Sequence, residues 1–425
     1  MKHSPRNAAG PAIPAKWKPS FAATMATWRF LKNENVTPRE LVVPLRDCVR
    51  LHLAERPCDF VLSVSDWCKM KCGKHTAKKD VLQLTHAADV GYELTTHLLV
   101  DAEDGSPIAP YEMSLKTAQT VHTTCENPVA DVQHKEQVLP MMEASRSWDL
   151  PAKIVHVIDS EADSLGHWRQ WAEAGHLFLV RGGDRYVTWE DRTMLVSEIV
   201  VELSENQRFL RTRDVEIKGK KAYQEIAEIA VILERPSRHK KNGKRTSRPG
   251  KPLSLRLVIS RVRDPQTHEI LSTWYLSTNA PAAVPTELLA LWYYWRWRIE
   301  TYFKLMKSAG LELDRWQQET GRAILNRLLV ASMAAAMVWN LERDSSEEAI
   351  EFKNQLVGLS GKTVKRSRPH TPGALLSGLF VLFQIFDFLE EMDFDVDKIL
   401  KLRAQLDRLL PGLPQQKKYQ PHRRE

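Results

Sequence analysis

Residues 153–159 read Lys153-Ile154-Val155-His156-Val157-Ile158-Asp159, a nearly unbroken run of apolar, mostly β-branched side chains that ends on a carboxylate. A run of this kind is typical of a strand buried on both faces of a sheet. Residues 160–175 follow with a helical pattern, and residues 177–180 form the next apolar segment. Strands that alternate with helices in this way predict an α/β core.

The residues that precede this run predict further strands of the same sheet. Residues 60–66 alternate and also end on a carboxylate, Asp66, and residues 92–100 and 108–114 predict two further strands. A helix is predicted over residues 135–148. Because strand ends in open α/β sheets are where ligands usually bind, Asp66 and Asp159 are candidate site residues.

The remaining patterns divide the chain into five regions. Residues 1–55 are a helical N-terminal region in which Thr37, Pro38 and Glu40 fit a capping box. Residues 56–185 and 285–344 are the two parts of the core, and residues 345–425 are a helical C-terminal region. Between the two parts, residues 186–284 predict a β-rich subdomain with strands at 198–203, 226–233, 253–262 and 270–277 and a basic loop at 237–251.

Composition excludes several classes of protein. With 425 residues, 43% hydrophobic and 27% charged, the chain is neither mainly disordered nor a coiled-coil rod nor a collagen-like polymer. Its five cysteines are odd in number and no apolar signal core follows Met1, which predicts a reduced, cytosolic protein. The spacing of Cys68, Cys72 and His75, with Cys58 upstream, does not match a closed zinc site. The longest apolar stretches, at 328–339 and 375–386, fall short of the ~20 residues that span a bilayer, so we expect no membrane insertion.

The positive charge is concentrated in one segment. The net charge is +8, and residues 235–263 contain 11 basic residues and no acidic one, so the rest of the chain sums to −3. A local patch of this kind attracts a polyanion, most often a phosphate backbone. Four of its members, Lys240, Lys241, Lys244 and Arg245, are candidates for nucleic-acid contact. The alternative is a solvated flap without a partner.

Residues 292–307 predict a helix with a polar row. Five side chains fall within an arc of roughly 80° on a helical wheel: Tyr293, Arg296, Glu300, Lys304 and Lys307. One explanation is an exposed ladder of ion pairs, worth a few tenths of a kcal/mol per pair. The other adds Glu300 to Asp66 and Asp159 as a third carboxylate. Such carboxylates hold Mg²⁺, and two ions clamp the attacking and leaving oxygens of a phosphoryl displacement.

At this point the sequence resembles a family. The spacing Tyr293-x2-Arg296-x3-Glu300-x6-Lys307 matches the Tyr-Arg-Glu-Lys signature of bacterial DDE transposases of insertion-sequence family four. The family's second motif matches Val157-Ile158-Asp159-Ser160-Glu161-Ala162-Asp163. Its first motif aligns with residues 61–66, although Trp67 and Cys68 follow where small residues and Thr are common. The resemblance covers residues 58–340.

The resemblance implies an RNase H-like catalytic core interrupted by a mostly β insertion subdomain, with helical N- and C-terminal regions. Asp66, Asp159 and Glu300 would be catalytic and would bind two Mg²⁺ or Mn²⁺ ions. Tyr293 and Arg296 would hold the terminal phosphate, Lys304 and Lys307 would contact the DNA backbone, and Trp274 would lie near a flipped base, unless it is only a packed indole. Arg181 and Arg185 follow a core strand, where they either contact phosphate or are merely solvated.

The implied function is that of a cut-and-paste DNA transposase, cytoplasmic and nucleoid-associated, which acts as a homodimer on double-stranded DNA at element ends and targets. Residues 1–55 are the candidate for end recognition and residues 345–425 for dimerisation. Two alternatives remain: a catalytically silent DNA-binding protein derived from a transposase, and a stand-alone RNase H-like nuclease. Metal-dependent nicking separates the first from a transposase, and preference for element ends separates the second.

Overall fold

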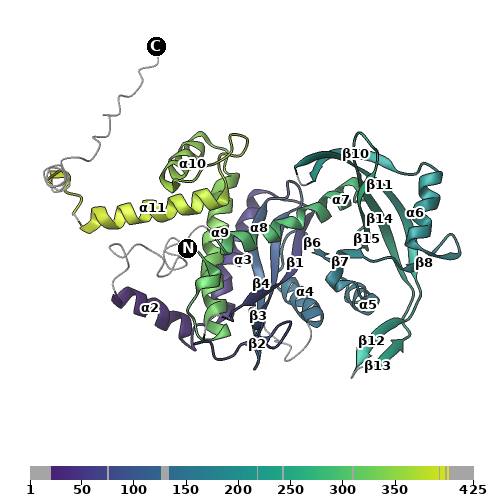
Figure 1. Cartoon of the computed structure of the whole chain (residues 1–425), viewed down its shortest axis with the longest axis horizontal. Helices are drawn as coiled ribbons and strands as arrows, with labels where there is room; N and C mark the ends of the chain where they lie inside the picture. The colour runs from purple at the N-terminus through teal and green to yellow at the C-terminus, as the bar shows by residue number, and fades with distance from the viewer. Residues whose placement is uncertain are drawn as a thin grey trace, which may run out of the picture.

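The computed structural model describes residues 21–73, 76–125, 134–217, 219–241, 244–308, 311–391, 393–397 and 400–401. Within these residues the fold is mixed α/β, with thirteen strands in one sheet and helices packed on it (Figure 1). The strand order is β5-β4-β3-β1-β6-β7-β15-β14-β11-β8-β9, and β2 and β10 pair with β3 and β11. The predicted α/β class is confirmed.

Five strands form the half of the sheet that carries the candidate site. They are β1 (Phe60–Lys71), β3 (Val90–Asp101), β4 (Pro107–Lys116), β6 (Lys153–Ile158) and β7 (Leu177–Gly182). β1 runs antiparallel to β3 and parallel to β6, β3 runs antiparallel to β4, and β6 runs parallel to β7. The strands predicted in these segments are confirmed. The expectation that the first strand ends on Asp66 is wrong, because pairing with β3 continues from Asp66 to Lys71.

The strands of the predicted insertion extend the same sheet. They are β8 (Tyr186–Trp189), β9 (Arg192–Leu195), β10 (Leu210–Ile217), β11 (Lys220–Leu233), β14 (Leu253–Arg263) and β15 (Ile270–Thr278). β15 pairs antiparallel with β7, so hydrogen bonds run continuously from one group of strands into the other. The strands predicted at 226–233, 253–262 and 270–277 are confirmed.

Two predictions in this segment are wrong. Residues 198–203 lie in a helix, α6 (Val196–Glu205), because its buried residues Val196, Ile199 and Leu203 recur at intervals of three and four. The basic loop contains a two-stranded hairpin, β12 (Ser237–Lys241) and β13 (Lys244–Arg248), visible at the lower right of Figure 1. Cross-strand pairing of like charges is unfavourable. The hairpin nevertheless places Lys240 opposite Arg245 and Lys241 opposite Lys244.

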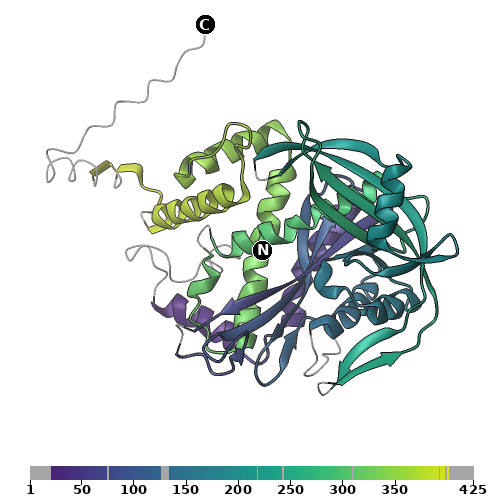
Figure 2. The ribbon, with the colours of Figure 1, turned by 45° about the vertical axis from the view of Figure 1, so that its right-hand side comes forward.

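Two hydrophobic cores pack against the sheet. The larger one includes residues of α3 (Pro38–Glu55), α7 (Thr286–Trp295), α8 (Trp297–Met306), α9 (Gly321–Arg343), α10 (Glu347–Ser360) and α11 (Pro372–Glu391). The other includes residues of α4 (Val138–Arg146), α5 (Leu165–Glu173) and α6. Figures 1 and 2 show α3 and α9 on one side of the sheet and α4 and α5 on the other. The remaining short elements are α2 (Phe21–Lys32), β2 (Leu82–Gln83), β5 (Val121–Thr123), η2 (His134–Gln137), η3 (Ser160–Ala162) and η4 (Leu313–Arg315).

One helix start follows its local sequence signal, and two predicted helices are divided in the structure. The capping box is confirmed, since the Thr37 side chain accepts from the Glu40 N–H and the Glu40 carboxylate accepts from the Thr37 N–H. The helix predicted over 160–175 is divided into η3 and α5. The helix predicted over 292–307 is divided at Arg296 into α7 and α8.

The helices α9 and α11 extend beyond the apolar stretches at 328–339 and 375–386 that they contain. By length and composition alone, α9 and residues 372–390 of α11 are able to cross a membrane. In α9, 83% of the most apolar window is buried inside the protein, against 33% in α11. The burial of α9 is that of a core helix, and one or two such helices are weak evidence for a span.

Three buried histidines lie in a row beneath the site. The rings of His97 and His156 are 6.5 Å apart, and those of His156 and His176 are 5.6 Å apart. His97 contacts the Ser65 hydroxyl at 3.2 Å, and His176 contacts Glu143 at 2.9 Å. Burial lowers the pKa of His97 to about 3, and burial together with both neighbouring histidines lowers the pKa of His156 well below its usual value.

This row predicts loss of stability in acid. A histidine whose pKa is lowered by folding takes up its proton only on unfolding, so its contribution is present at neutral pH and is lost as pH falls below about 6.5. For His97 we expect a loss of about 2 kcal/mol in the free energy of unfolding between about pH 7.5 and pH 5. Urea unfolding at both pH values measures this loss. In His97→Gln the loss should be smaller than in the wild type by about 2 kcal/mol. In His86→Gln, at an exposed site, it should equal that of the wild type. Equal losses in all three proteins contradict the prediction.

Candidate active site

The first two predicted carboxylates stand side by side at the edge of the parallel part of the sheet. The parallel pairing of β1 with β6 ends at Ser65 and Ile158, and Asp66 and Asp159 are the next residues on the two strands. After Asp159 the chain turns into η3, and the Asp159 side chain accepts a hydrogen bond from the Ser160 N–H as the N-cap. Each aspartate side chain is 20% exposed.

The third carboxylate is brought to this edge by the junction of α7 and α8. Arg296 occupies the junction, and its side chain is 6% exposed. Its Nη1 lies 3.7 Å from Oδ2 of Asp66. Its Nη2 lies 3.4 Å from Oδ2 of Asp159 and 3.2 Å from Oε1 of Glu300. One guanidinium group therefore contacts carboxylates from β1, from the end of β6 and from α8.

The aromatic candidates lie against the same cluster. The Tyr293 hydroxyl donates to Oδ1 of Asp159 at 3.3 Å. The Tyr293 ring meets the Trp274 indole edge to face at a centroid distance of 5.3 Å. Trp274 is half-buried on β15, so its ring is both a packing partner of Tyr293 and partly open to solvent. Tyr293 therefore connects the insertion strand β15 to Asp159.

The two arginines after the core strand have different partners. Arg181 pairs with Oδ1 of Asp159 at 2.8 Å and donates to the Ser160 hydroxyl at 3.0 Å. Arg185 forms an ion pair with Asp163 and stacks over the Trp168 ring at 4.3 Å. The structure therefore brings Arg181 into the carboxylate cluster and holds Arg185 beside it, against η3.

The predicted lysines lie farther out along the chain. Lys304 and Lys307 are exposed, one and two turns beyond Glu300. The predicted polar row is therefore only partly solvated, because Tyr293 and Arg296 are buried while Glu300, Lys304 and Lys307 are exposed. Lys240, Lys241, Lys244 and Arg245 lie on the β12–β13 hairpin, and their side chains are outside the described residues.

The charges of the cluster are not balanced. Three carboxylates face two guanidinium groups, those of Arg296 and Arg181. Burial raises the pKa of Asp66 to about 6, in spite of the Trp67 N–H and Arg296. Burial also acts to raise the pKa of Asp159, but Arg296, the Ser160 N–H and Arg181 hold it below its usual value. Of the two aspartates, Asp66 is therefore the one whose negative charge is poorly compensated and which takes up a proton more readily.

The two aspartates predict opposite pH effects in metal-free protein. Because folding raises the pKa of Asp66, its contribution to stability is complete below about pH 4 and is lost as pH rises through about 6. We expect Asp66→Asn to be more stable than the wild type by about 1–3 kcal/mol at about pH 8, with the advantage gone near pH 4. Asp159→Asn should be less stable than the wild type at pH 8, because folding lowers that pKa. Chemical denaturation with a chelator present measures both, and a destabilised Asp66→Asn at pH 8 contradicts the account.

The chemistry of the donor set, though not its present spacing, fits a hard divalent cation. Carboxylate oxygens are the protein ligands that Mg²⁺ prefers, and the excess negative charge is of the sign that such an ion neutralises. Within the described ranges, no three Asp, Glu, His or Cys side chains stand close enough to hold a metal ion. The Arg296 guanidinium now lies among the three carboxylates. To bind a metal ion, the carboxylates must give up contacts with Arg296 and contact the ion instead.

Sequence reasoning missed one supporting contact. The Asp163 carboxylate accepts from the Gly183 N–H at 2.8 Å in addition to pairing with Arg185. These contacts fix η3, whose N-cap is Asp159 and whose C-cap is Asp163, against the end of β7. The motif around Asp159 contains Asp163, for which the sequence predicts only a favourable charge near the start of the following helix. Helical spacing predicts the i,i+4 contact of Arg296 with Glu300, but not its contacts with Asp66 and Asp159.

Comparison with known proteins gives one family. The sequence model of the family described as Transposase DDE domain matches residues 112–339, more than half of the chain, and these residues include Asp159 and Glu300. Among solved structures, the chain is similar to the piggyBac transposase in a cryo-EM structure of its synaptic complex with hairpin DNA. The sequence identity is 10% and the TM-score is 0.38, over 98% of this chain and 76% of that chain. None of the curated proteins compared matches the chain.

Proposed function

Because the chain belongs to the Transposase DDE domain family, we propose that it is a DNA transposase that excises and inserts its own mobile element by cut-and-paste strand cleavage and strand transfer. The single observation that carries this proposal is the meeting of Asp66, Asp159 and Glu300 around the Arg296 guanidinium. These carboxylates come from three elements that are far apart in the sequence.

The order of the core strands supports an RNase H-like core. Counted along the chain, the strands β1, β3, β4, β6 and β7 lie in the order 3-2-1-4-5, and only the second runs antiparallel to its neighbours. In this arrangement the first and fourth strands are adjacent and parallel, which places Asp66 beside Asp159. The insertion of β8–β15 between this core and α7 accounts for the long separation of Asp159 and Glu300.

Asp66, Asp159 and Glu300 would hold two Mg²⁺ or Mn²⁺ ions, as members of this family generally use divalent metals. Such ions stabilise the charge on the attacking and leaving oxygens of a phosphodiester. Arg296 and Tyr293 would hold the phosphate at the cut end, and the buried Arg296 Nε, which has no hydrogen-bond partner among the described residues, is a free donor for this role. Arg181 would orient Asp159 through their 2.8 Å ion pair.

The surrounding residues would position the DNA. Lys304 and Lys307 continue the α8 face beyond Glu300 and would contact backbone phosphates, which fix register without reading sequence. The half-buried Trp274 would stack on a base near the cut, next to Tyr293. The β12–β13 hairpin, with Lys240, Lys241, Lys244 and Arg245, would contact the backbone of a longer duplex.

The chemistry needs no protein nucleophile. Water would hydrolyse one phosphodiester at the element end and free a 3′-hydroxyl, which would attack the opposite strand, displace the 3′-oxygen of the flanking DNA and close a hairpin. A second water would reopen the hairpin, and the regenerated 3′-hydroxyl would attack target DNA and displace a 3′-hydroxyl there. We propose that a homodimer acts on paired ends in the cytoplasm, at the nucleoid, with the C-terminal region as the dimer contact and the N-terminal region as the end reader.

The test uses full-length protein, Mg²⁺ and a labelled duplex that carries an inverted end of the element flanking the gene. A random duplex of equal length and a chelator are the controls. A transposase nicks at the end sequence and forms a hairpin only with Mg²⁺. Equal cutting of both duplexes would instead identify a stand-alone nuclease, and binding without any cutting would identify a silent DNA-binding protein.

A further inference from the structure

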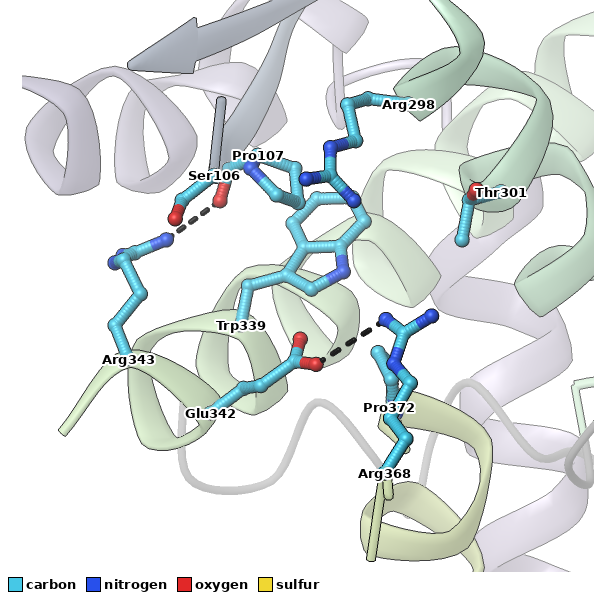
Figure 3. Close-up of a pocket in the computed structure, with 9 residues that line it drawn as sticks. All are labelled: Ser106, Pro107, Arg298, Thr301, Trp339, Glu342, Arg343, Arg368 and Pro372. Carbon is cyan, nitrogen blue, oxygen red and sulfur yellow. Dashed lines mark hydrogen bonds and ion pairs between the residues drawn. The ribbon is translucent and has the colours of Figure 1, made fainter. Parts of the chain in front are cut away.

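A pocket of about 210 Å³ lies behind the candidate active site, between α8, the end of α9 and the segment that leads into α11. Arg298 stands two residues before Glu300, which at 100° per residue places it on nearly the opposite side of α8. Figure 3 shows the side chains that line the pocket, which include Arg298, Thr301, Trp339, Glu342, Arg343 and Arg368. The pocket is smaller than the ~300 Å³ at which sites for drug-sized ligands begin.

The side chains that line the pocket carry three guanidinium groups and one carboxylate, an excess of two positive charges before the nearby Asp101 and Asp104 are counted. Of these three guanidinium groups, only that of Arg368 pairs with the lining carboxylate, at 3.5 Å from Glu342. Arg343 donates to the Pro107 carbonyl at 2.5 Å, which is a neutral partner. Within the part of the chain that the structure describes, the Arg298 side chain makes no hydrogen bond or close ion pair, although the Glu342 and Asp104 carboxylates attract it. A carboxylate near the rim, Asp104, is already paired with Arg56 at 2.9 Å.

Two of the three guanidinium groups are held where water is partly excluded, while that of Arg368 is 57% exposed. Arg298 and Arg343 are half-buried, and the Trp339 indole between them is 1% exposed. Burial and the neighbouring Arg368 lower the pKa of Arg298, against the attraction of Glu342 and Asp104. Partly buried charges are costly when they must share one counter-charge, and three guanidinium groups share the Glu342 carboxylate, so the pocket favours a further anion.

We propose that this pocket binds one phosphate group through Arg298, Arg343 and Arg368. The planar fork of a guanidinium matches phosphate oxygens, and the surplus of two positive charges matches a phosphate better than a single carboxylate. The phosphate comes from one of two sources: a free phosphate or nucleotide in solution, or the backbone of a DNA segment that passes behind α8. Only the second source rests on the proposed function.

Such a ligand would join three elements. Arg298 belongs to α8, which carries Glu300, while Arg343 ends α9 and Arg368 lies before α11. A phosphate bridging the three would fix the C-terminal helices against the back of the helix that carries Glu300. Phosphate binding is therefore expected to stabilise the whole protein as well as to fill the pocket.

The first arm of the test uses inorganic phosphate and full-length protein at constant ionic strength, with calorimetry and thermal unfolding as readouts. The wild type should bind one phosphate and its Tm should rise saturably. Arg298→Gln should weaken phosphate affinity about tenfold, the size expected for one charged hydrogen bond. Arg192→Gln, the same charge change at an exposed pair on β9, should bind like the wild type. Thr301→Glu, which places a carboxylate at the exposed rim without removing a packed group, should also weaken binding.

The second arm uses a duplex in chelator, where no cutting occurs, and measures Kd against salt concentration. If a backbone phosphate occupies the pocket, Arg298→Gln should make the slope of the logarithm of the association constant against log salt shallower by about 0.9. Arg192→Gln should leave the slope unchanged. Phosphate binding with an unchanged slope assigns the pocket to free phosphate or a nucleotide. The assignment is overturned if the wild type does not bind phosphate, or if Arg298→Gln and Thr301→Glu bind it as tightly as the wild type. A failure to cut DNA affects the proposed function alone.

Discussion

Replacing Asp159 with asparagine is expected to reduce strand cleavage at an element end by at least about a thousandfold. Asp159 stands where the parallel strands end, contacts Arg296, Arg181 and Tyr293, and is one of three carboxylates proposed to hold the metal ions. An amide keeps the shape and removes the charge. Loss of several kcal/mol of charge stabilisation at the reacting phosphate corresponds to this factor.

The measurement is single-turnover cleavage of a labelled end with Mg²⁺, accompanied by duplex affinity in chelator. Affinity should stay within about threefold of the wild type, because lysines and arginines supply the backbone contacts. Asp214→Asn, which removes an 81% exposed carboxylate paired with Arg211 on β10, is the matched control and should cut normally. Asp159→Asn that cuts at the wild-type rate would remove this residue from the site.

Replacing Arg296 with glutamine is the second change with a large expected effect. Arg296 is 6% exposed and contacts all three carboxylates, so its loss leaves partly buried negative charges without their common partner. Breaking a buried pair costs about 3–5 kcal/mol. We therefore expect the free energy of unfolding of metal-free Arg296→Gln to fall by about 3 kcal/mol, and cleavage to fall at least about a hundredfold.

A metal titration makes this prediction specific. If Arg296 and the divalent ions neutralise the same carboxylates, Mn²⁺ should raise the Tm of Arg296→Gln more than that of the wild type. Arg315→Gln, at an ion pair whose arginine is 79% exposed, should change stability by less than about 1 kcal/mol and respond to Mn²⁺ like the wild type. An Arg296→Gln protein that is as stable as the wild type and indifferent to Mn²⁺ would contradict this role of Arg296.

Much of the fold follows from local patterns. The β-branched run at β6 and the capping box at Thr37 have physical causes confined to a few neighbouring residues, and both were predicted from them. The strand predicted at 198–203 failed because Glu198–Leu203 is apolar enough to suit either structure, while its buried residues are spaced for a helix. β1 extends beyond Asp66 because β3 pairs with it, and that pairing is not local.

The candidate site was predictable in its members but not in its arrangement. Strand ends and helical spacing selected Asp66, Asp159 and Glu300, yet the spacing alone suited an exposed ion-pair ladder equally well. The burial of Arg296 among the three carboxylates depends on the packing of α7 and α8 on the sheet. The pocket behind α8 gave no sequence signal at all, because Arg298, Arg343 and Arg368 are brought together only by the ends of separate helices.

The most direct test of the central claim is Mn²⁺ binding to full-length protein by isothermal titration calorimetry. The account predicts that the wild type binds Mn²⁺ and that Asp66→Asn, Asp159→Asn and Glu300→Gln each weaken the affinity by at least about tenfold, since the carboxylates share the ions. Asp214→Asn should leave it unchanged. Equal Mn²⁺ affinity in the wild type and all three site variants would contradict the claim that these carboxylates form one metal site.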